Sequence, residues 1–266
     1  RWTVVTRDRS LSVHVEDMVA VQHALVKRHL GLDQLLCVTG GSFGGMQALR
    51  WPIDHPEMVH SCMPIATSAR LSAQAIAFDE VGRQAIYSDP NWRGGGYYGA
   101  APPNRGLAVA RMVGHITYLS DRSMHEKFGR RLQDREDVGY DFGPPDFQVE
   151  SYLRHQGGKF VGRFDANSYL YITKAMDYFD LASDLGGAVE AFRGVKSRFL
   201  VVSFTGDWLF PTYQSRELVR ALQANGVRVS FCELESPYGH DIFLLENPGL
   251  EDVIRSFLAN AQEATG

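Results

Sequence analysis

A serine between two pairs of glycines is the first candidate for chemistry. Gly40-Gly41-Ser42-Phe43-Gly44 matches G-x-S-x-G and lies between an apolar run and a predicted helix. That context is typical of a nucleophile elbow, where a sharp turn exposes the serine hydroxyl and glycines admit neighbouring backbone. The Phe43 amide, at the start of the helix, is the expected oxyanion donor. A plain structural turn is the alternative, because the lysine of a phosphate loop and the glycine spacing of a dinucleotide motif are both missing.

A serine hydroxyl needs a base and a group that orients the base. Asp207 follows the apolar run RFLVVSF, and His240 follows the next predicted strand. Chains with this elbow carry Ser, acid and His in that order, and the carboxyl ends of parallel strands meet at one sheet edge. Alone, Asp207 could be a turn residue and His240 a loop residue. Together with Ser42 they predict a triad, in which His240 takes the Ser42 proton, Asp207 fixes the imidazole and an acyl-serine forms.

The elements that must position these side chains alternate between helix and strand. The pattern predicts an α/β protein whose mostly parallel sheet is covered on both faces. Strands are expected at 35–39, 58–67, 198–204 and 227–235, and helices at 15–31, from 44 until Pro52, 213–226 and 247–261.

The middle of the chain breaks this alternation. Residues 68–192 contain helical runs separated by loops rich in Gly and Pro, and no convincing strand. We therefore expect a core of residues 1–67 and 193–266, with a helical insertion at 68–192.

Composition narrows the class of protein. The 266 residues are 44% hydrophobic and 22% charged, with a formal net charge of −4. These values are typical of a soluble globular protein and give no reason to expect a nucleic-acid partner, and no apolar run is long enough for a membrane span. The three cysteines fit free, buried thiols in a cytoplasmic protein. Without C-x-x-C or His-x-x-x-His spacing, we expect no metal.

The chain resembles the homoserine O-acyltransferase family, of the MetX type, within the α/β-hydrolase fold. The segments that carry the resemblance are GGSFGGMQALRW, PIATSARLSAQAIAF, ARMVGHITYLS, KFVGRFDANSYLYIT, VVSFTGDWLFP and SPYGHD. The resemblance implies a hydrolase sheet with an inserted helical lid. It implies acyl transfer from acetyl-CoA or succinyl-CoA to the hydroxyl of homoserine by a ping-pong route, in methionine biosynthesis. It also implies small-molecule substrates, no permanently bound cofactor, and a homodimer that pairs through the lid.

The resemblance also assigns residues. It makes Ser42 the nucleophile, Asp207 the acid and His240 the base. It implies that Asp241 holds the substrate ammonium and Arg111 the substrate carboxylate. An amino-acid substrate carries one charge of each sign, so one side chain of each sign is expected in its pocket. From the residues alone, Arg111 could be a solvated helix residue and Asp241 a helix N-cap.

The front of the chain departs from the family pattern. The family begins with several strands and a loop that supplies a second oxyanion amide, whereas this chain reaches the family motifs almost at once. We expect the N-terminal strands to be missing, either because this sequence is a fragment or because the gene product is truncated.

Two alternatives to acyl transfer stay open. One is a short-chain ester hydrolase, which needs the triad but neither Arg111 nor Asp241. The other is a catalytically silent binding protein of the same fold.

Overall fold

The computed structural model describes residues 12–140, 142–184 and 186–263, which form two compact units. The helical unit comprises residues 72–174, and the sheet unit comprises 12–71 with 175–263. The helical unit is shorter at both ends than the predicted insertion, 68–192, because residues 68–71 and 175–192 belong to the sheet unit.

The elements of the sheet unit are α1 (Val15–Ala24), the π-helical turn η1 (Leu25–His29), β1 (Val38–Gly41), α2 (Phe43–Asp54), β2 (Ser61–Ile65), α8 (Leu181–Asp184), α9 (Ala188–Ala191), β3 (Arg198–Phe204), α10 (Thr212–Ala224), β4 (Val229–Leu234), the 3-10 turn η3 (His240–Leu244) and α11 (Pro248–Glu263). Those of the helical unit are α3 (Ala73–Tyr87), the 3-10 turn η2 (Arg93–Gly95), α4 (Asn104–Tyr118), α5 (Asp121–Lys127) and α6 (Gln148–Val161). The helix α7 (Ala166–Tyr178) begins in the helical unit and ends in the sheet unit.

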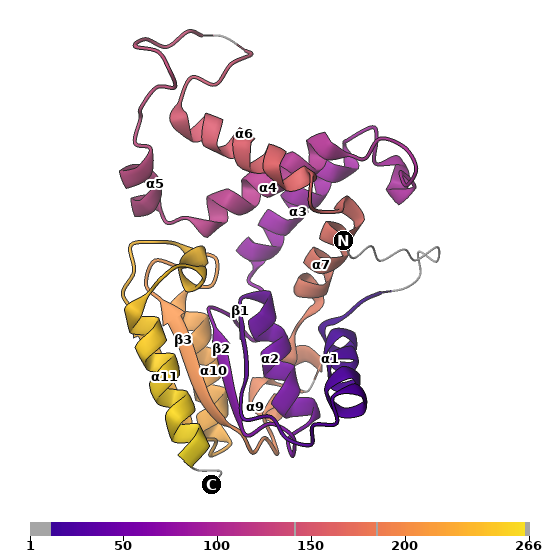
Figure 1. Ribbon diagram of the computed structural model, residues 1–266, viewed down its shortest axis with the longest axis vertical. Helices are drawn as coiled ribbons and strands as arrows, with labels where there is room; N and C mark the ends of the chain where they lie inside the picture. Colours follow the sequence, from indigo (N-terminus) through magenta and orange to yellow (C-terminus); the bar gives the residue numbers. More distant parts are fainter. Residues whose placement is uncertain (1–11, 141, 185, 264–266) are drawn as a thin grey trace. The chain divides into compact units, whose positions relative to one another are not determined.

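Four parallel strands form the described sheet, in the order β1-β2-β3-β4. The register pairs Gly41 with Ile65 and Phe204 with Leu234, so strand ends are aligned at the carboxyl edge. This arrangement confirms the predicted fold class, a parallel sheet flanked by helices. In Figure 1 the strands lie between α11 on one side and α2 on the other.

Successive side chains of a strand point to opposite faces of the sheet, so their contacts show which helix covers which face. Cys62 of β2 contacts α2 through Ala48, and Ser203 of β3 accepts a hydrogen bond from Thr212 of α10. Met63 and Val202, one position along, belong to the buried core that α11 completes. The sheet is therefore covered by α2 and α10 on one face and by α11 on the other.

The predicted strands are confirmed in place but not always in length. β3 covers the predicted residues 198–204, whereas β1 begins at Val38 instead of residue 35. Leu35 makes only an isolated bridge to Val59. The strand then extends through Gly40 and Gly41, so the first half of the glycine motif is strand and only Ser42 is the turn.

The prediction that the second helix ends at Pro52 is wrong, because α2 continues through Pro52 to Asp54. Proline has no N–H, so the carbonyl of Ala48, four residues earlier, loses its helical donor. Cys62 replaces that donor: its Sγ lies 3.2 Å from the Ala48 oxygen. Burial raises the pKa of this thiol well above its ordinary value, so the thiol keeps its proton. A buried cysteine therefore satisfies the carbonyl that the proline leaves unpaired.

In the helical unit, small residues let three helices pack closely. A Cβ on Gly106 of α4 would lie 2.4 Å from the Ala85 oxygen of α3, and a Cβ on Gly157 of α6 would lie 2.8 Å from the Ala108 oxygen of α4. The start of α4 is held by Asp89, whose carboxylate accepts from the Gly106 amide at 2.9 Å. α4 is thus fixed between α3 and α6. No helix in the described parts of the chain is both long and apolar enough to span a membrane.

The thiol–proline pairing makes a prediction about stability. Cys62→Ala leaves the Ala48 carbonyl unpaired in the core and should lower the free energy of unfolding by about 2 kcal/mol. Pro52→Ala restores the missing N–H, so in that background the cost of Cys62→Ala should fall by about 1 kcal/mol. Urea unfolding of the four proteins measures this double-mutant cycle. Cys232→Ala, in which a half-buried thiol is removed, is the control; a cycle with no coupling would contradict the pairing.

Candidate active site

Ser42 occupies a strained turn between β1 and α2. Its backbone has φ 55° and ψ −122°, which is costly for a residue with a side chain, by about 1–3 kcal/mol. Three neighbours hold it there. The Ser42 amide donates to Ile65 of β2 at 2.9 Å, and its carbonyl accepts from the Gly45 amide at 2.9 Å and the Thr67 hydroxyl at 2.8 Å. The turn is therefore fixed by both the helix it starts and the neighbouring strand.

Gly40 and Gly45 permit this turn. A Cβ on Gly40 would lie 2.2 Å from the Gly44 oxygen, and one on Gly45 would lie 2.6 Å from Thr67. Both are backbone or short side-chain contacts that have no room to move. Close packing thus requires Gly40, as the sequence pattern predicts. It does not require Gly44, the second glycine of the motif, where a Cβ would have nothing within 4 Å; the next residue, Gly45, is the one that packs closely.

Asp207 and His240 form a buried hydrogen-bonded pair. The His240 Nδ1 lies 2.7 Å from Asp207 Oδ2, and each residue is only 3% exposed. The other carboxylate oxygen accepts from the amides of Leu209 and Phe210, at 3.0 and 2.8 Å. These three hydrogen bonds compensate the buried Asp207 carboxylate for the hydrogen bonds to water that it loses. The pair can hold the imidazole in one tautomer, with Nε2 as the basic nitrogen.

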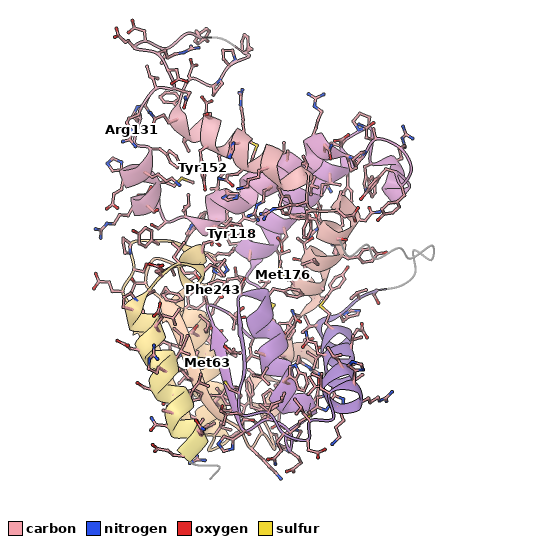
Figure 2. All side chains as sticks on the ribbon, in the orientation of Figure 1. Met63, Tyr118, Arg131, Tyr152, Met176 and Phe243 are labelled. Carbon is pink, nitrogen blue, oxygen red and sulfur yellow. The ribbon has the colours of Figure 1, made fainter. Side chains whose placement is uncertain are left out.

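Two phenylalanines fix the plane of the imidazole. Phe210 stacks on His240 at 5.0 Å between ring centroids, and Phe243 meets it edge-on at 5.5 Å. Phe243 also packs on the serine turn, since a Cβ on Gly41 would lie 2.3 Å from its ring. Figure 2 labels Phe243 near the edge of the sheet, beyond Met63 of β2. One aromatic ring thus joins the segment of Ser42 to the segment of His240.

Gly206 brings the loops after β3 and β4 together. A Cβ at this position would lie 2.2 Å from the Tyr238 oxygen and 2.5 Å from the Ser236 oxygen. The Ser236 amide donates to the Thr205 hydroxyl at 3.1 Å, which ties the two loops beyond the paired strands. This close approach is what allows Asp207 to reach His240.

The predicted residues are placed as follows. Ser42, Asp207 and His240 all follow the carboxyl ends of parallel strands, so they share one sheet edge. Phe43 opens α2, where helix N–H groups lack partners inside the helix. Asp241 lies inside η3, whose N-cap is Gly239, so the structure does not give Asp241 the alternative role of an N-cap.

Arg111 lies on α4 in the helical unit, and its guanidinium is over the rings of Tyr118 and Phe160, at 5.2 and 4.8 Å. Its predicted role at a substrate carboxylate stays a prediction, as does the role of Asp241. Among the described residues, no group of three or more His, Cys, Asp or Glu could hold a metal ion.

Sequence reasoning missed the residues that hold the site together. Phe210, Phe243, Gly206 and Thr67 were not singled out. Gly206 directly precedes Asp207, and each phenylalanine lies three residues after Asp207 or His240. A glycine before the acid and an aromatic residue after each partner are signals that could have found three of the four.

The fold and this edge define the class of the protein. A family model for the alpha/beta hydrolase fold matches residues 7–247, most of the chain. The chain belongs to the alpha/beta hydrolase fold family.

Within that family, the sequence resemblance is confirmed. The chain is 58% identical over 251 residues to a homoserine O-acetyltransferase of Solidesulfovibrio magneticus, covering 94% of this chain and 63% of the relative. It is 59% identical over 256 residues to a homoserine O-acetyltransferase of Rhodopseudomonas palustris, and the match covers 96% of this chain and 64% of that relative. The chain therefore spans somewhat less than two thirds of the length of the curated relatives it matches.

Solved structures agree on the fold. The structure of a homoserine O-acetyltransferase from Bacillus anthracis matches with a TM-score of 0.82 at 25% identity, over 96% of this chain and 65% of that one. The structure of esterase E22 matches with a TM-score of 0.83 at 25% identity, over 93% of this chain and 67% of that one. One fold in these comparisons thus carries the names of both a transferase and an esterase.

The contact between Gly41 and Phe243 makes a prediction about the site. Gly41→Ala should displace the Phe243 ring and with it His240, and so lower esterase activity on p-nitrophenyl acetate by about 10²-fold. Adding Phe243→Ala removes the clash and should recover part of that loss. Gly40→Ala, whose clash is with backbone, should be destabilised with or without Phe243→Ala. Equal activity of Gly41→Ala and the original chain would contradict the contact.

Proposed function

We propose that this protein transfers an acyl group, most simply acetyl, from acyl-CoA to the hydroxyl of L-homoserine through an acyl-Ser42 intermediate. The observation that carries the proposal is the buried Asp207–His240 pair at the sheet edge where the Ser42 turn lies, in a chain 58–59% identical to homoserine O-acetyltransferases. Acyl-CoA is a co-substrate in this proposal, and no permanently bound cofactor is invoked.

The first half-reaction loads the serine. The Nε2 of His240 takes the proton of Ser42 Oγ, and the oxygen attacks the thioester carbonyl. Asp207 supports the imidazolium that forms, and the Phe43 amide donates to the oxyanion. The carbon–sulfur bond then breaks, and the leaving thiolate receives the proton from His240. The enzyme is left as an acyl ester on Ser42, and the free thiol departs.

The second half-reaction unloads it. The homoserine hydroxyl gives its proton to His240 and attacks the acyl carbon. The bond from that carbon to Ser42 Oγ breaks, and His240 returns the proton to the serine. Donor and acceptor therefore react in turn, which is a ping-pong scheme. Arg111 and Asp241 are proposed to favour homoserine over water by binding its carboxylate and its ammonium.

Ester hydrolysis is the second candidate, and the likeness to esterase E22 favours it. Water would then replace homoserine in the second half-reaction, with every triad residue in the same role. The two functions differ only in what binds beside the acyl-serine, so the acceptor decides between them.

The rest of the proposal follows the resemblance. The reaction would serve methionine biosynthesis in the cytoplasm, and the active form would be a homodimer that pairs through the helical unit. Support for these points comes from the sequence resemblance alone, with which the name of the curated relatives, homoserine O-acetyltransferase, agrees.

The nucleophile assignment predicts the effect of Ser42→Ala. Removing Oγ leaves no atom to accept the acyl group, so transfer from acetyl-CoA to homoserine should fall by about 10⁴-fold or more. The midpoint temperature of thermal unfolding should be unchanged or slightly higher, because alanine keeps the same turn. Thiol release followed with a chromogenic disulfide measures the rate. Full activity in this variant would rule out Ser42 as the nucleophile.

The acceptor assignment predicts the effect of Asp241→Asn. The amide keeps the shape but not the charge, so the homoserine KM should rise about tenfold or more while the acetyl-CoA KM changes little. Hydrolysis of p-nitrophenyl acetate should be retained, since it needs no ammonium site. A chain that hydrolyses this ester but shows no rate increase with homoserine would support the esterase function.

A further inference from the structure

A second left-handed residue lies beside the serine turn. Ala66, directly after β2, is fully buried and has φ 47°, a conformation that is rare and costly for a residue with a side chain. Its amide donates to the Val202 carbonyl of β3 at 2.9 Å, and the Ile65 carbonyl before it accepts from the Ser42 amide at 2.9 Å. The two neighbouring strand ends therefore fix this bend. The residue after the bend, Thr67, lies against the start of α2.

Gly45 of α2 makes room for Thr67. A Cβ on Gly45 would lie 2.6 Å from the Cβ and Cγ2 of Thr67 and 2.9 Å from its hydroxyl oxygen. The Thr67 hydroxyl donates to the Ser42 carbonyl at 2.8 Å, and the Gly45 amide donates to the same oxygen at 2.9 Å. Thr67 is 1% exposed, so this contact lies inside the protein. The glycine just beyond the motif thus lets a hydroxyl from the next strand reach the carbonyl of the serine.

The Ser42 carbonyl belongs to the same peptide unit as the Phe43 amide. A peptide unit is planar and trans, so its C=O and N–H point in opposite directions and turn together. Because the carbonyl points to the Gly45 amide of α2 and to Thr67, the Phe43 N–H points away from both. Phe43 is the first residue of α2, so no carbonyl of the helix pairs with this N–H. A group that holds the Ser42 carbonyl therefore also sets the direction of the Phe43 N–H.

We propose that Thr67 is a positioning residue for the oxyanion donor: its hydroxyl holds the Ser42 carbonyl and so aims the Phe43 N–H. The inference rests on the proposed function, in which Ser42 is the nucleophile and the Phe43 amide donates to the oxyanion. Linked hydrogen bonds polarise one another, so a donor on this carbonyl also strengthens the N–H of the same peptide unit. The Gly45 amide keeps its own bond to the carbonyl. Loss of the Thr67 hydroxyl therefore loosens the oxyanion donor without removing it.

This role differs from simple support of the turn. A contact that only stabilises the fold affects the free enzyme and the transition state alike, whereas an aimed oxyanion donor acts when negative charge develops on the substrate oxygen. The Thr67 hydroxyl should therefore contribute to kcat and to the binding of a tetrahedral anion, and contribute little to KM.

The test compares three variants in the hydrolysis of p-nitrophenyl acetate. Thr67→Val and Thr67→Ala remove the hydroxyl, with and without a similar side-chain shape, and Thr67→Ser keeps it. In the first two, kcat should fall about tenfold, less than the about 10²–10³-fold cost of losing a whole oxyanion donor, and KM should change less than about twofold. Phenylboronic acid, which forms an anionic tetrahedral adduct with a serine, should bind them about tenfold more weakly. Thr67→Ser should restore both values.

Thr39→Val is the matched control. The Thr39 hydroxyl of β1 donates to the Met63 carbonyl of β2 at 2.9 Å, so the same substitution removes the same kind of bond away from the serine turn. Its kcat and its affinity for phenylboronic acid should equal those of the original chain. Urea unfolding of every variant shows that each is folded in the assay. Because Thr67→Val and Thr67→Ala place different side chains against Gly45, the test does not depend on one of them folding.

Three results would overturn the role of Thr67. They are an unchanged kcat in both variants that lack the hydroxyl, a rise in KM without a fall in kcat, and a loss in Thr67→Ser as large as that in Thr67→Val. The ester assay also separates this inference from the proposed function. Loss of ester hydrolysis in Ser42→Ala, with full kcat in Thr67→Val, would sink the role of Thr67 alone. The expected Thr67 effects in a chain that transfers no acetyl group to homoserine would keep that role and sink acyl transfer.

Discussion

The backbone turn at Ser42 is the constraint on which the site depends. A non-glycine residue at φ 55° and ψ −122° persists only where its surroundings leave no alternative. Here the amide of Ser42 is bonded to β2, and its carbonyl is bonded to α2 and to Thr67. Because β1 and β2 are in fixed parallel register, the serine is held at the carboxyl edge of the sheet. The same register, continued through β3 and β4, brings Asp207 and His240 to that edge.

The site is held together by close contacts between backbone segments. Gly40, Gly41 and Gly206 each lie where a Cβ would be 2.2 or 2.3 Å from another atom. Phe243 contacts both the serine turn and His240, so its ring links the two segments. The buried Asp207 carboxylate needs its two backbone amides as well as the imidazole, since a buried charge without donors would be costly. Positioning and electrostatics are thus supplied by the same loops.

Much of this could be predicted from the sequence because the signals are local. The apolar run of β3 and the glycines around Ser42 indicate a strand and a turn without reference to the rest of the chain. Parallel topology then predicts that Asp207 and His240 share an edge. The packing of Phe243 on Gly41 could not be predicted, because it joins residues some 200 positions apart. The continuation of α2 through Pro52 also depends on a distant residue, Cys62, whose thiol replaces the missing donor.

Mass spectrometry of the chain mixed with acetyl-CoA, in the absence of homoserine, tests the central claim most directly. We predict one added acetyl group on the peptide that contains Ser42, and its removal when homoserine is then supplied. The O-acetyl product should appear in the same step. Acetylation at another residue, or an acetyl group on Ser42 that homoserine does not remove faster than water does, would contradict acyl transfer through this serine.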